Sequence, residues 1–143
     1  MKKLLPIVAI LITIYIGWSQ LDHPTGFVSH EGQNDTLFAN AFEEGKSDIQ
    51  AKGKGIVIRI LPDDNDGSRH QRFILKLDSS QTLLIAHNID LAPRISTLKE
   101  GDAISFYGVY EWNSKGGVVH WTHHDPDGRH IAGWLQHNDK TYQ

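Results

Sequence analysis

Short stretches in which apolar and polar residues alternate, separated by turn-forming residues, follow one another from Gly53 towards the C-terminus. Such stretches occupy residues 53–61, 72–77, 82–88, 103–112 and 118–122. Because alternate residues of a strand point to opposite faces, each stretch would bury one face and expose the other. The pattern predicts an all-β domain of five strands and places four side chains in its core: Phe73, Leu75, Ile104 and Phe106.

The arrangement of these stretches resembles an OB-fold, a small five-stranded barrel. One brief connector, residues 90–95, separates the third stretch from the fourth, and Leu98 opens a Leu-x-x-Gly-Asp sequence before the fourth. Glycines within strands, here Gly55 and Gly108, permit the sharp bends that closing a small barrel requires. The resemblance implies an OB-like five-stranded antiparallel barrel. We place this barrel at residues 53–124, with residues 20–52 at its periphery.

The N-terminal residues have the composition of a secretory signal peptide. Two lysines precede an apolar run at residues 4–18, which is shorter than a typical membrane-spanning helix. Gly17 and Ser19 supply the small residues that suit cleavage before Gln20. We therefore expect an exported protein, periplasmic or extracellular, with no stable membrane domain once the signal is cleaved. The alternative is an anchor in the inner membrane formed by residues 4–18.

The balance of charge bears on the kind of partner. After removal of residues 1–19 the chain has 12 Lys and Arg residues against 17 Asp and Glu, a net charge of −5. Binding to nucleic acids without sequence specificity needs clustered positive charge, so this balance does not favour a nucleic-acid partner.

Residues 20–52 carry most of the acidic excess and one helical pattern. Apolar side chains recur at helical spacing after Asp35, a candidate N-cap, and the pattern stops at Gly45. The sequence thus predicts three parts: a signal peptide at 1–19, an acidic stem with a short helix at 20–52, and the OB-like domain at 53–143.

The segment 118–130 contains four of the nine histidines and the turn sequence Asp-Pro-Asp-Gly. A four-residue turn would place His123 opposite His130 and gather the large apolar residues of both arms on one face. The two imidazoles could then ligate one divalent metal ion such as zinc, with His120 or His87 as a third ligand. Because the chain has no cysteine, a metal would need His, carboxylate or carbonyl ligands. The alternative is that the histidines are hydrogen-bonded polar residues and Asp125 only caps its turn.

Further candidate site residues lie at strand ends and in the connector. His87 could supply a further ligand, while turn and cap chemistry would also explain the neighbouring Asn88 and Asp90. Arg69, His70 and Arg72 could hold an anion, or line the end of a solvated hairpin. The candidate ligand-binding residues are Arg72, His87, Asn88, Asp90, Arg94 and Trp121, and the candidate catalytic bases are His124 and Asp125.

Three longer sequence motifs, which we call the three sequence words, distinguish the chain. They are Arg-His-Gln-Arg-Phe at 69–73, Ala-His-Asn-Ile-Asp-Leu-Ala-Pro-Arg at 86–94, and His-Trp-Thr-His-His-Asp-Pro at 120–126. With these words, the region from about residue 53 to residue 142 resembles a bacterial family of small exported proteins catalogued as a domain of unknown function. The resemblance implies family membership and carries no mechanism.

Three classes of function fit these observations. The first, which we favour, is an exported binding module that holds a small ligand, sugar or peptide, with aromatic platforms drawn from Tyr110, Trp112, Trp121 and Trp134. The second is a metal-dependent hydrolase, such as a nuclease, in which Arg72 or Arg94 steadies a phosphate. The third is a structural or stress protein of the cell envelope, with an envelope partner. Whether the protein is an enzyme stays open at this point.

Overall fold

The structure is a computed structural model, and it describes residues 30–143 of the chain. The expected signal peptide at residues 1–19 lies outside the described residues. Within 30–143, no helix has the length and apolar character needed to cross a membrane. The elements in chain order are α2 (His30–Glu43), β1 (Ile49–Asp64), β2 (His70–Lys76), β3 (Thr82–Asn88), β4 (Ala103–Glu111), β5 (Val118–His120), β6 (Trp134–His137) and β7 (Lys140–Tyr142).

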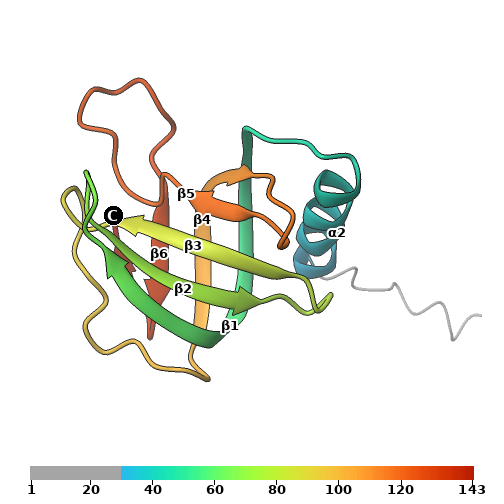
Figure 1. The fold of residues 1–143 in the computed structure, drawn as a ribbon, viewed down its shortest axis with the longest axis horizontal. Coiled ribbons are helices and arrows are strands. Elements are labelled where there is room, and N and C mark those ends of the chain that lie inside the picture. Colours follow the sequence, from blue (N-terminus) through green and yellow to red (C-terminus); the bar gives the residue numbers. More distant parts are fainter. Residues whose placement is uncertain (1–29) are drawn as a thin grey trace, which may run out of the picture.

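The strands form a ring, which the long strand β1 closes (Figure 1). The first half of β1 pairs with β4, from Ile49 opposite Tyr110 to Ile56 opposite Ala103. Its second half pairs with β2, and the pairing continues from β2 to β3, from β3 to β5, and from β5 back to β4. The mostly β architecture with a ring of five strands is therefore confirmed.

Two details of the expected barrel need correction. The pairing of β3 with β5 is parallel, so the ring is not wholly antiparallel. In addition, β6 and β7 extend the sheet beyond the ring to seven strands, because β6 pairs with β4 next to β5. Along β4, the strand β5 pairs with residues 109–111, and β6 pairs with residues 105–107.

The expected histidine hairpin does not form. The register that would place His123 opposite His130 is wrong, because β5 ends at His120 and residues 121–133 contain no strand. A strand has only two edges for backbone pairing, and both edges of β5 are occupied, so a second arm had no place beside it. Trp134, which follows this segment, pairs with Tyr107 of β4.

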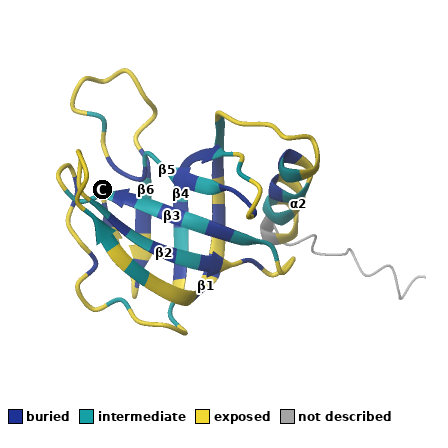
Figure 2. Ribbon diagram, in the orientation of Figure 1, coloured by how far each residue is buried: buried dark blue, intermediate teal, exposed yellow. Residues whose placement is uncertain are grey.

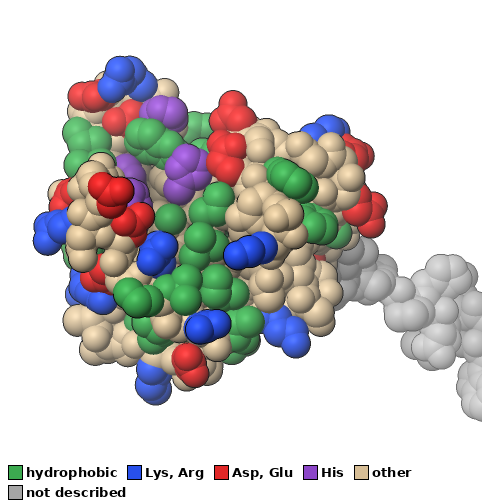
Figure 3. Space-filling view, in the orientation of Figure 1, with side chains coloured by type: hydrophobic (Ala, Val, Ile, Leu, Met, Phe, Trp, Pro, Cys, Tyr) green, Lys and Arg blue, Asp and Glu red, His purple; other side chains and the backbone are tan. Residues whose placement is uncertain are grey.

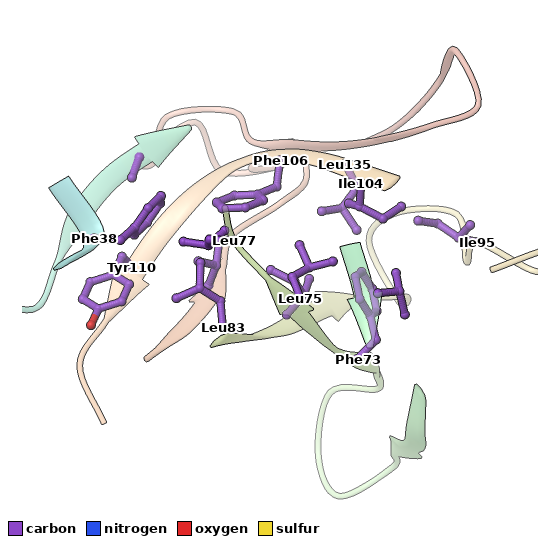
Figure 4. Close-up of a cluster of buried hydrophobic side chains, with 14 of the residues drawn as sticks. Phe38, Phe73, Leu75, Leu77, Leu83, Ile95, Ile104, Phe106, Tyr110 and Leu135 are labelled. Atoms are coloured by element: carbon purple, nitrogen blue, oxygen red, sulfur yellow. The ribbon is translucent and has the colours of Figure 1, made fainter. Parts of the chain in front are cut away.

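The interior of the ring holds the apolar core (Figures 2 and 4). The four side chains predicted to be buried, Phe73, Leu75, Ile104 and Phe106, all have 0% exposure, which confirms the strand faces read from the sequence. The core also includes Phe38 and Ala41 of α2, so this helix is not peripheral (Figure 2).

The helix also begins earlier than expected. It starts at His30, five residues before the predicted N-cap at Asp35. The Asp35 carboxylate accepts a hydrogen bond from the backbone N–H of Ser79 at 2.8 Å, and so ties the helix to the turn between β2 and β3. Phe38 then packs against Phe106 and Tyr110, with ring centroids 5.7 Å apart in both pairs. Tyr110 was a candidate aromatic platform, but it is fully buried and donates its hydroxyl proton to the carbonyl of Gly116.

Candidate functional site

A small surface hollow lies where β2 begins and where β3 and β5 end. Its volume is about 140 Å³, and it is lined by His70, Asn88, Leu91, His120, Trp121 and His123. We call it the histidine hollow. Each of the three sequence words at 69–73, 86–94 and 120–126 contributes residues to its wall. Figure 3 shows histidine side chains gathered on this part of the face. Three segments that are distant in the chain thus meet at one place on the surface.

Strand pairing explains the meeting of the first two segments. His70 and Asn88 are directly opposite one another in the antiparallel pair β2–β3, so their side chains share a face. Arg72 and Ala86 form the next outward pair on the same face. The parallel pairing of β5 with β3 then carries His120 to the same end of the ring as Asn88.

Two of the histidines have their tautomers set by backbone carbonyls. His70 Nδ1 lies 2.8 Å from the carbonyl oxygen of Ser68, and His123 Nδ1 lies 2.6 Å from that of His124. A carbonyl oxygen only accepts, so each Nδ1 carries the proton when the ring is neutral. The Nε2 atom of each ring is then a lone-pair acceptor. The hydrogen bond at Nδ1 therefore fixes the orientation of each ring, and Nε2 can accept a hydrogen bond from another group.

His120 is in a different environment. Its Nε2 is buried and has no hydrogen-bond partner among residues 30–143, and Glu111 Oε1 is 3.6 Å away. Burial lowers the pKa of His120, although Glu111 opposes this effect. Desolvation thus favours the neutral ring, which is the form that can accept a hydrogen bond or ligate a metal.

His87 lies behind the hollow and does not face it. The ring is fully buried, with Nε2 3.1 Å from the carbonyl oxygen of Pro93 and Nδ1 2.8 Å from Thr122 Oγ1. Nε2 therefore donates to Pro93, and Nδ1 accepts from the hydroxyl of Thr122. Burial lowers the pKa of His87 to about 4. Both ring nitrogens are used within the protein, so His87 supports the loop that carries Trp121 and His123.

The backbone around Trp121 is held in an uncommon conformation. Trp121 has φ of 55°, a left-handed value that costs energy for a bulky residue. Gly133 packs so closely that an added methyl group would collide with the carbonyl oxygen of Trp121, and its N–H donates to the carbonyl of His123 at 2.9 Å. The Thr122 side chain is tied to His87 from the other side. Residues 121–123 are thus fixed by three separate contacts, as a binding site requires.

The side chain of Trp121 contacts two of the predicted metal ligands. Its ring stacks on His130 with centroids 3.8 Å apart, and it is tilted against His123 with centroids 5.3 Å apart. His130 is therefore near the hollow, although the hollow's lining does not include it. Within residues 30–143, no three His, Asp or Glu side chains are grouped so that they could hold a metal ion. Metal binding by His120, His123 and His130 accordingly stays a prediction.

The two candidate bases have structural contacts of their own. The predicted turn at 125–128 is confirmed, since the N–H of Gly128 donates to the carbonyl of Asp125. The Asp125 carboxylate accepts from the backbone N–H groups of Asp127, Arg129 and His130. These bonds, that from Asp127 first, lower the pKa of Asp125. The carboxylate therefore acts as a cap for its loop, whereas the side chain of His124 is exposed.

The remaining candidates outside the hollow are bonded to the protein itself. Arg72 donates twice to the carbonyl of Pro62, at 3.1 and 3.0 Å, and braces the hairpin between β1 and β2. Arg94 forms an ion pair with Asp63 at 2.9 Å, and Asp90 forms one with Arg69 at 2.7 Å. Leu91 and Glu111 were not among the predicted site residues. Glu111 comes near His120 through the pairing of β4 with β5, whereas Leu91 lies in the connector after β3.

His137 does not line the histidine hollow. It is buried in β6, and its Nε2 is 2.8 Å from Asp102 Oδ2. The pKa of Asp102 is lowered to about 2, mainly by its hydrogen bonds with Lys99 and further by His137. This pair joins β6 to the residue before β4, and neither residue lines the hollow.

Comparison with known proteins places the chain in a family without assigning an activity. Among curated proteins, no match was found. Residues 24–143 match a family model described as "Protein of unknown function (DUF3465)". The match covers most of the chain, including every residue that lines the histidine hollow. The chain therefore belongs to the DUF3465 family.

Proposed function

We propose that this protein is an exported ligand-binding domain and that the histidine hollow is its binding site. The single observation that carries the proposal is the meeting of three distant sequence words at one hollow. Trp121, one of the residues that line the hollow, has a left-handed backbone conformation. Strain of this kind is concentrated at binding and catalytic sites. The OB-like interpretation of the ring agrees with this assignment, since many such small barrels are binding modules.

The groups in the hollow define the chemistry of the ligand. The Nε2 atoms of His70 and His123 accept hydrogen bonds, so the ligand would present N–H or O–H donors. Trp121 and the side chain of Leu91, which is 44% exposed, add apolar surface. A volume of about 140 Å³ corresponds to about four or five water molecules. The ligand is therefore a small hydrogen-bond donor, or the end group of a larger molecule.

Protein-observed NMR with a library of small amides, amines and alcohols tests this assignment. We expect the active compounds to shift the backbone signals of residues 70, 88 and 120–123. His70→Ala should abolish these shifts, while His124→Ala should preserve them because His124 is exposed and lines no part of the hollow. Shifts that survive His70→Ala, or that map elsewhere, would contradict the assignment.

A metal-dependent hydrolase is the second candidate, and one observation favours it. Histidines that ligate metals usually donate their other ring N–H to a carbonyl or carboxylate, and both His70 and His123 donate in this way. Zinc or copper analysis of protein purified without a histidine tag distinguishes the two candidates. Stoichiometric metal that is lost in His123→Ala would favour the hydrolase. A metal-free protein that still binds donor fragments would favour the binding domain.

Export is the second part of the proposal. The apolar run at residues 4–18, with two preceding lysines and small residues before Gln20, supports it. Mass spectrometry of the protein produced in a bacterial host should find a mature N-terminus near Gln20. An intact Met1 in the membrane fraction would show that these residues form an anchor instead.

A further inference from the structure

A second and larger hollow lies on the outer face of the sheet, and none of its lining residues belongs to the three sequence words. Its volume is about 660 Å³, within the range of about 300–1,000 Å³ that is usual for binding sites of small molecules. The side chains that matter for its chemistry come from α2, β1, β4, β6 and the turn after β2: Asn34, Lys52, Asp78, Ser105, Trp134 and Gln136. We call it the Trp134 hollow.

Strand register arranges these side chains in two rows. Tyr107 of β4 lies between its partners Lys52 on β1 and Trp134 on β6. In the next row, Ser105 lies between Lys54 and Gln136. Because these residues alternate with buried ones along their strands, the rows lie on the outer face of the sheet, and all of their residues except Tyr107 line the hollow. An aromatic row thus borders a polar one.

Trp134 is held in place as a platform. Its ring contacts Tyr107 with centroids 6.3 Å apart, and Lys52 Nζ lies 5.4 Å from the ring centroid. The preceding residue, Gly133, packs against the carbonyl oxygens of Trp121 and Tyr107, which leaves no room for a side chain there. An aromatic side chain fixed in this way supplies contact area with little loss of conformational entropy on binding.

The charges around the hollow balance. Lys52 and Lys54 line it together with Asp35 and Asp78, two positive groups against two negative ones. A charged ligand would be attracted by one pair and repelled by the other, whereas an uncharged ligand would meet both donors and acceptors. The amides of Asn34 and Gln136 and the hydroxyl of Ser105 can each donate and accept, which is the pattern that matches a hydroxyl group.

We propose that the Trp134 hollow binds an uncharged saccharide, with Trp134 against the apolar C–H face of a sugar ring and Asn34, Ser105 and Gln136 bonded to its hydroxyl groups. Saccharides combine these two properties, an apolar ring face and a rim of hydroxyl groups. An aromatic platform bordered by amide and hydroxyl side chains is complementary to both. The proposal is independent of the histidine hollow, because the two hollows share no lining residue.

Isothermal titration calorimetry of the full chain with cellotriose, maltotriose and chitotriose tests the proposal. We expect at least one of these neutral trisaccharides to bind with a Kd of about 1 mM or tighter, which corresponds to about −4.1 kcal/mol. Trp134→Ala should weaken that binding at least about tenfold. Trp112→Ala is the matched control, since Trp112 is an exposed tryptophan, stacked on Phe42 outside the hollow.

Further variants keep the test decisive. Gln136 is exposed, so Gln136→Ala should weaken binding even if Trp134→Ala fails to fold. His70→Ala should leave saccharide binding unchanged, which separates this proposal from the proposed function. Absence of heat with all three sugars would overturn the proposal. So would binding that is confined to a charged probe, such as trigalacturonate, or that persists in both Trp134→Ala and Gln136→Ala.

Discussion

The two ends of the strand ring are closed in different ways. At one end α2 covers the ring, and Phe38 packs between Phe106 and Tyr110 in an apolar layer (Figure 4). At the other end the connector after β3 covers the ring; its Ile95 is buried in the apolar core, and hydrogen bonds hold the connector to the strands. Gln71 exchanges two of them with the backbone of Ile95, and His87 donates to the carbonyl of Pro93.

The difference has a simple physical cause. A helix satisfies its own backbone N–H and C=O groups, so the residues beneath it can be apolar. An irregular connector brings unpaired backbone groups to the core, and each of these needs a polar partner when water is excluded. Gln71 and His87, opposite one another on β2 and β3, supply those partners. The polar end is therefore where histidines are buried, and the histidine hollow forms on its outer side.

The largest expected effect is at the helix end. Phe106→Ala should lower the free energy of unfolding by about 3–5 kcal/mol, because it removes a fully buried ring and leaves a cavity beside Phe38. Urea denaturation measures the loss. Leu37→Ala is the control on the neighbouring helix position, which is 37% exposed and should cost far less. Equal losses in the two variants would mean that α2 does not close an apolar layer.

The polar end should be the source of sensitivity to acid. The pKa of His87 is about 4 in the folded protein, against an ordinary value of 6.5 when the chain is unfolded. The unfolded chain therefore binds more protons between these values, and stability falls as the pH is lowered from about 6.5 to 4. The loss attributable to His87 is about 3 kcal/mol. Urea denaturation across this pH range should show it, and His87→Gln should flatten the dependence. A profile that is unchanged in the variant would contradict the assignment to His87.

A smaller effect is expected for the hydroxyl that joins the polar end to the hollow. Thr122→Val should cost about 1–3 kcal/mol, since His87 Nδ1 would lose its buried donor while the shape is retained. Thr122→Ser retains the hydroxyl and should cost less. Thermal unfolding gives the comparison. If valine were tolerated as well as serine, the hydrogen bond would not be what fixes residues 121–123.

The smallest effect is expected at the exposed ion pair between Arg94 and Asp63. Arg94 was a candidate ligand-binding residue, but its guanidinium pairs with Asp63 at the surface, where the side chains are 44% and 22% exposed. Arg94→Gln should change the free energy of unfolding by less than about 1 kcal/mol, because solvent screens such a pair. It should also leave fragment binding to the histidine hollow unchanged. Loss of binding in this variant would extend the site to the connector.

Local sequence patterns predicted the faces of the strands correctly. Phe73, Leu75, Ile104 and Phe106 alternate with polar residues, and burial of alternate side chains requires nothing beyond the neighbouring residues. The turn at 125–128 was predicted for the same reason, since its Asp, Pro and Gly act within a few residues of one another. Membership of the family could also be inferred from the three words, because they are contiguous in the chain.

Partner choice between segments could not be read from the same patterns. The local pattern at 118–130 fitted a histidine hairpin, yet β3 and β4 occupy both edges of β5. The residues of 118–134 alone do not indicate which strands will pair with β5. Residues 30–34 of the helix likewise lie before the expected cap at Asp35, whose carboxylate instead bonds to a turn 44 residues away.

Alternation, turn chemistry and the acidic balance belong to the sequence by itself, because they act over a few residues or over composition alone. The tertiary structure decided which strand edges meet, which histidines become buried hydrogen-bond partners, and which side chains share a hollow. His87 and His123 look alike as residues of two histidine-bearing words, but one has both nitrogens used in the interior and the other keeps an acceptor nitrogen. That distinction depends on contacts between segments far apart in the chain, where backbone groups excluded from water must find their partners.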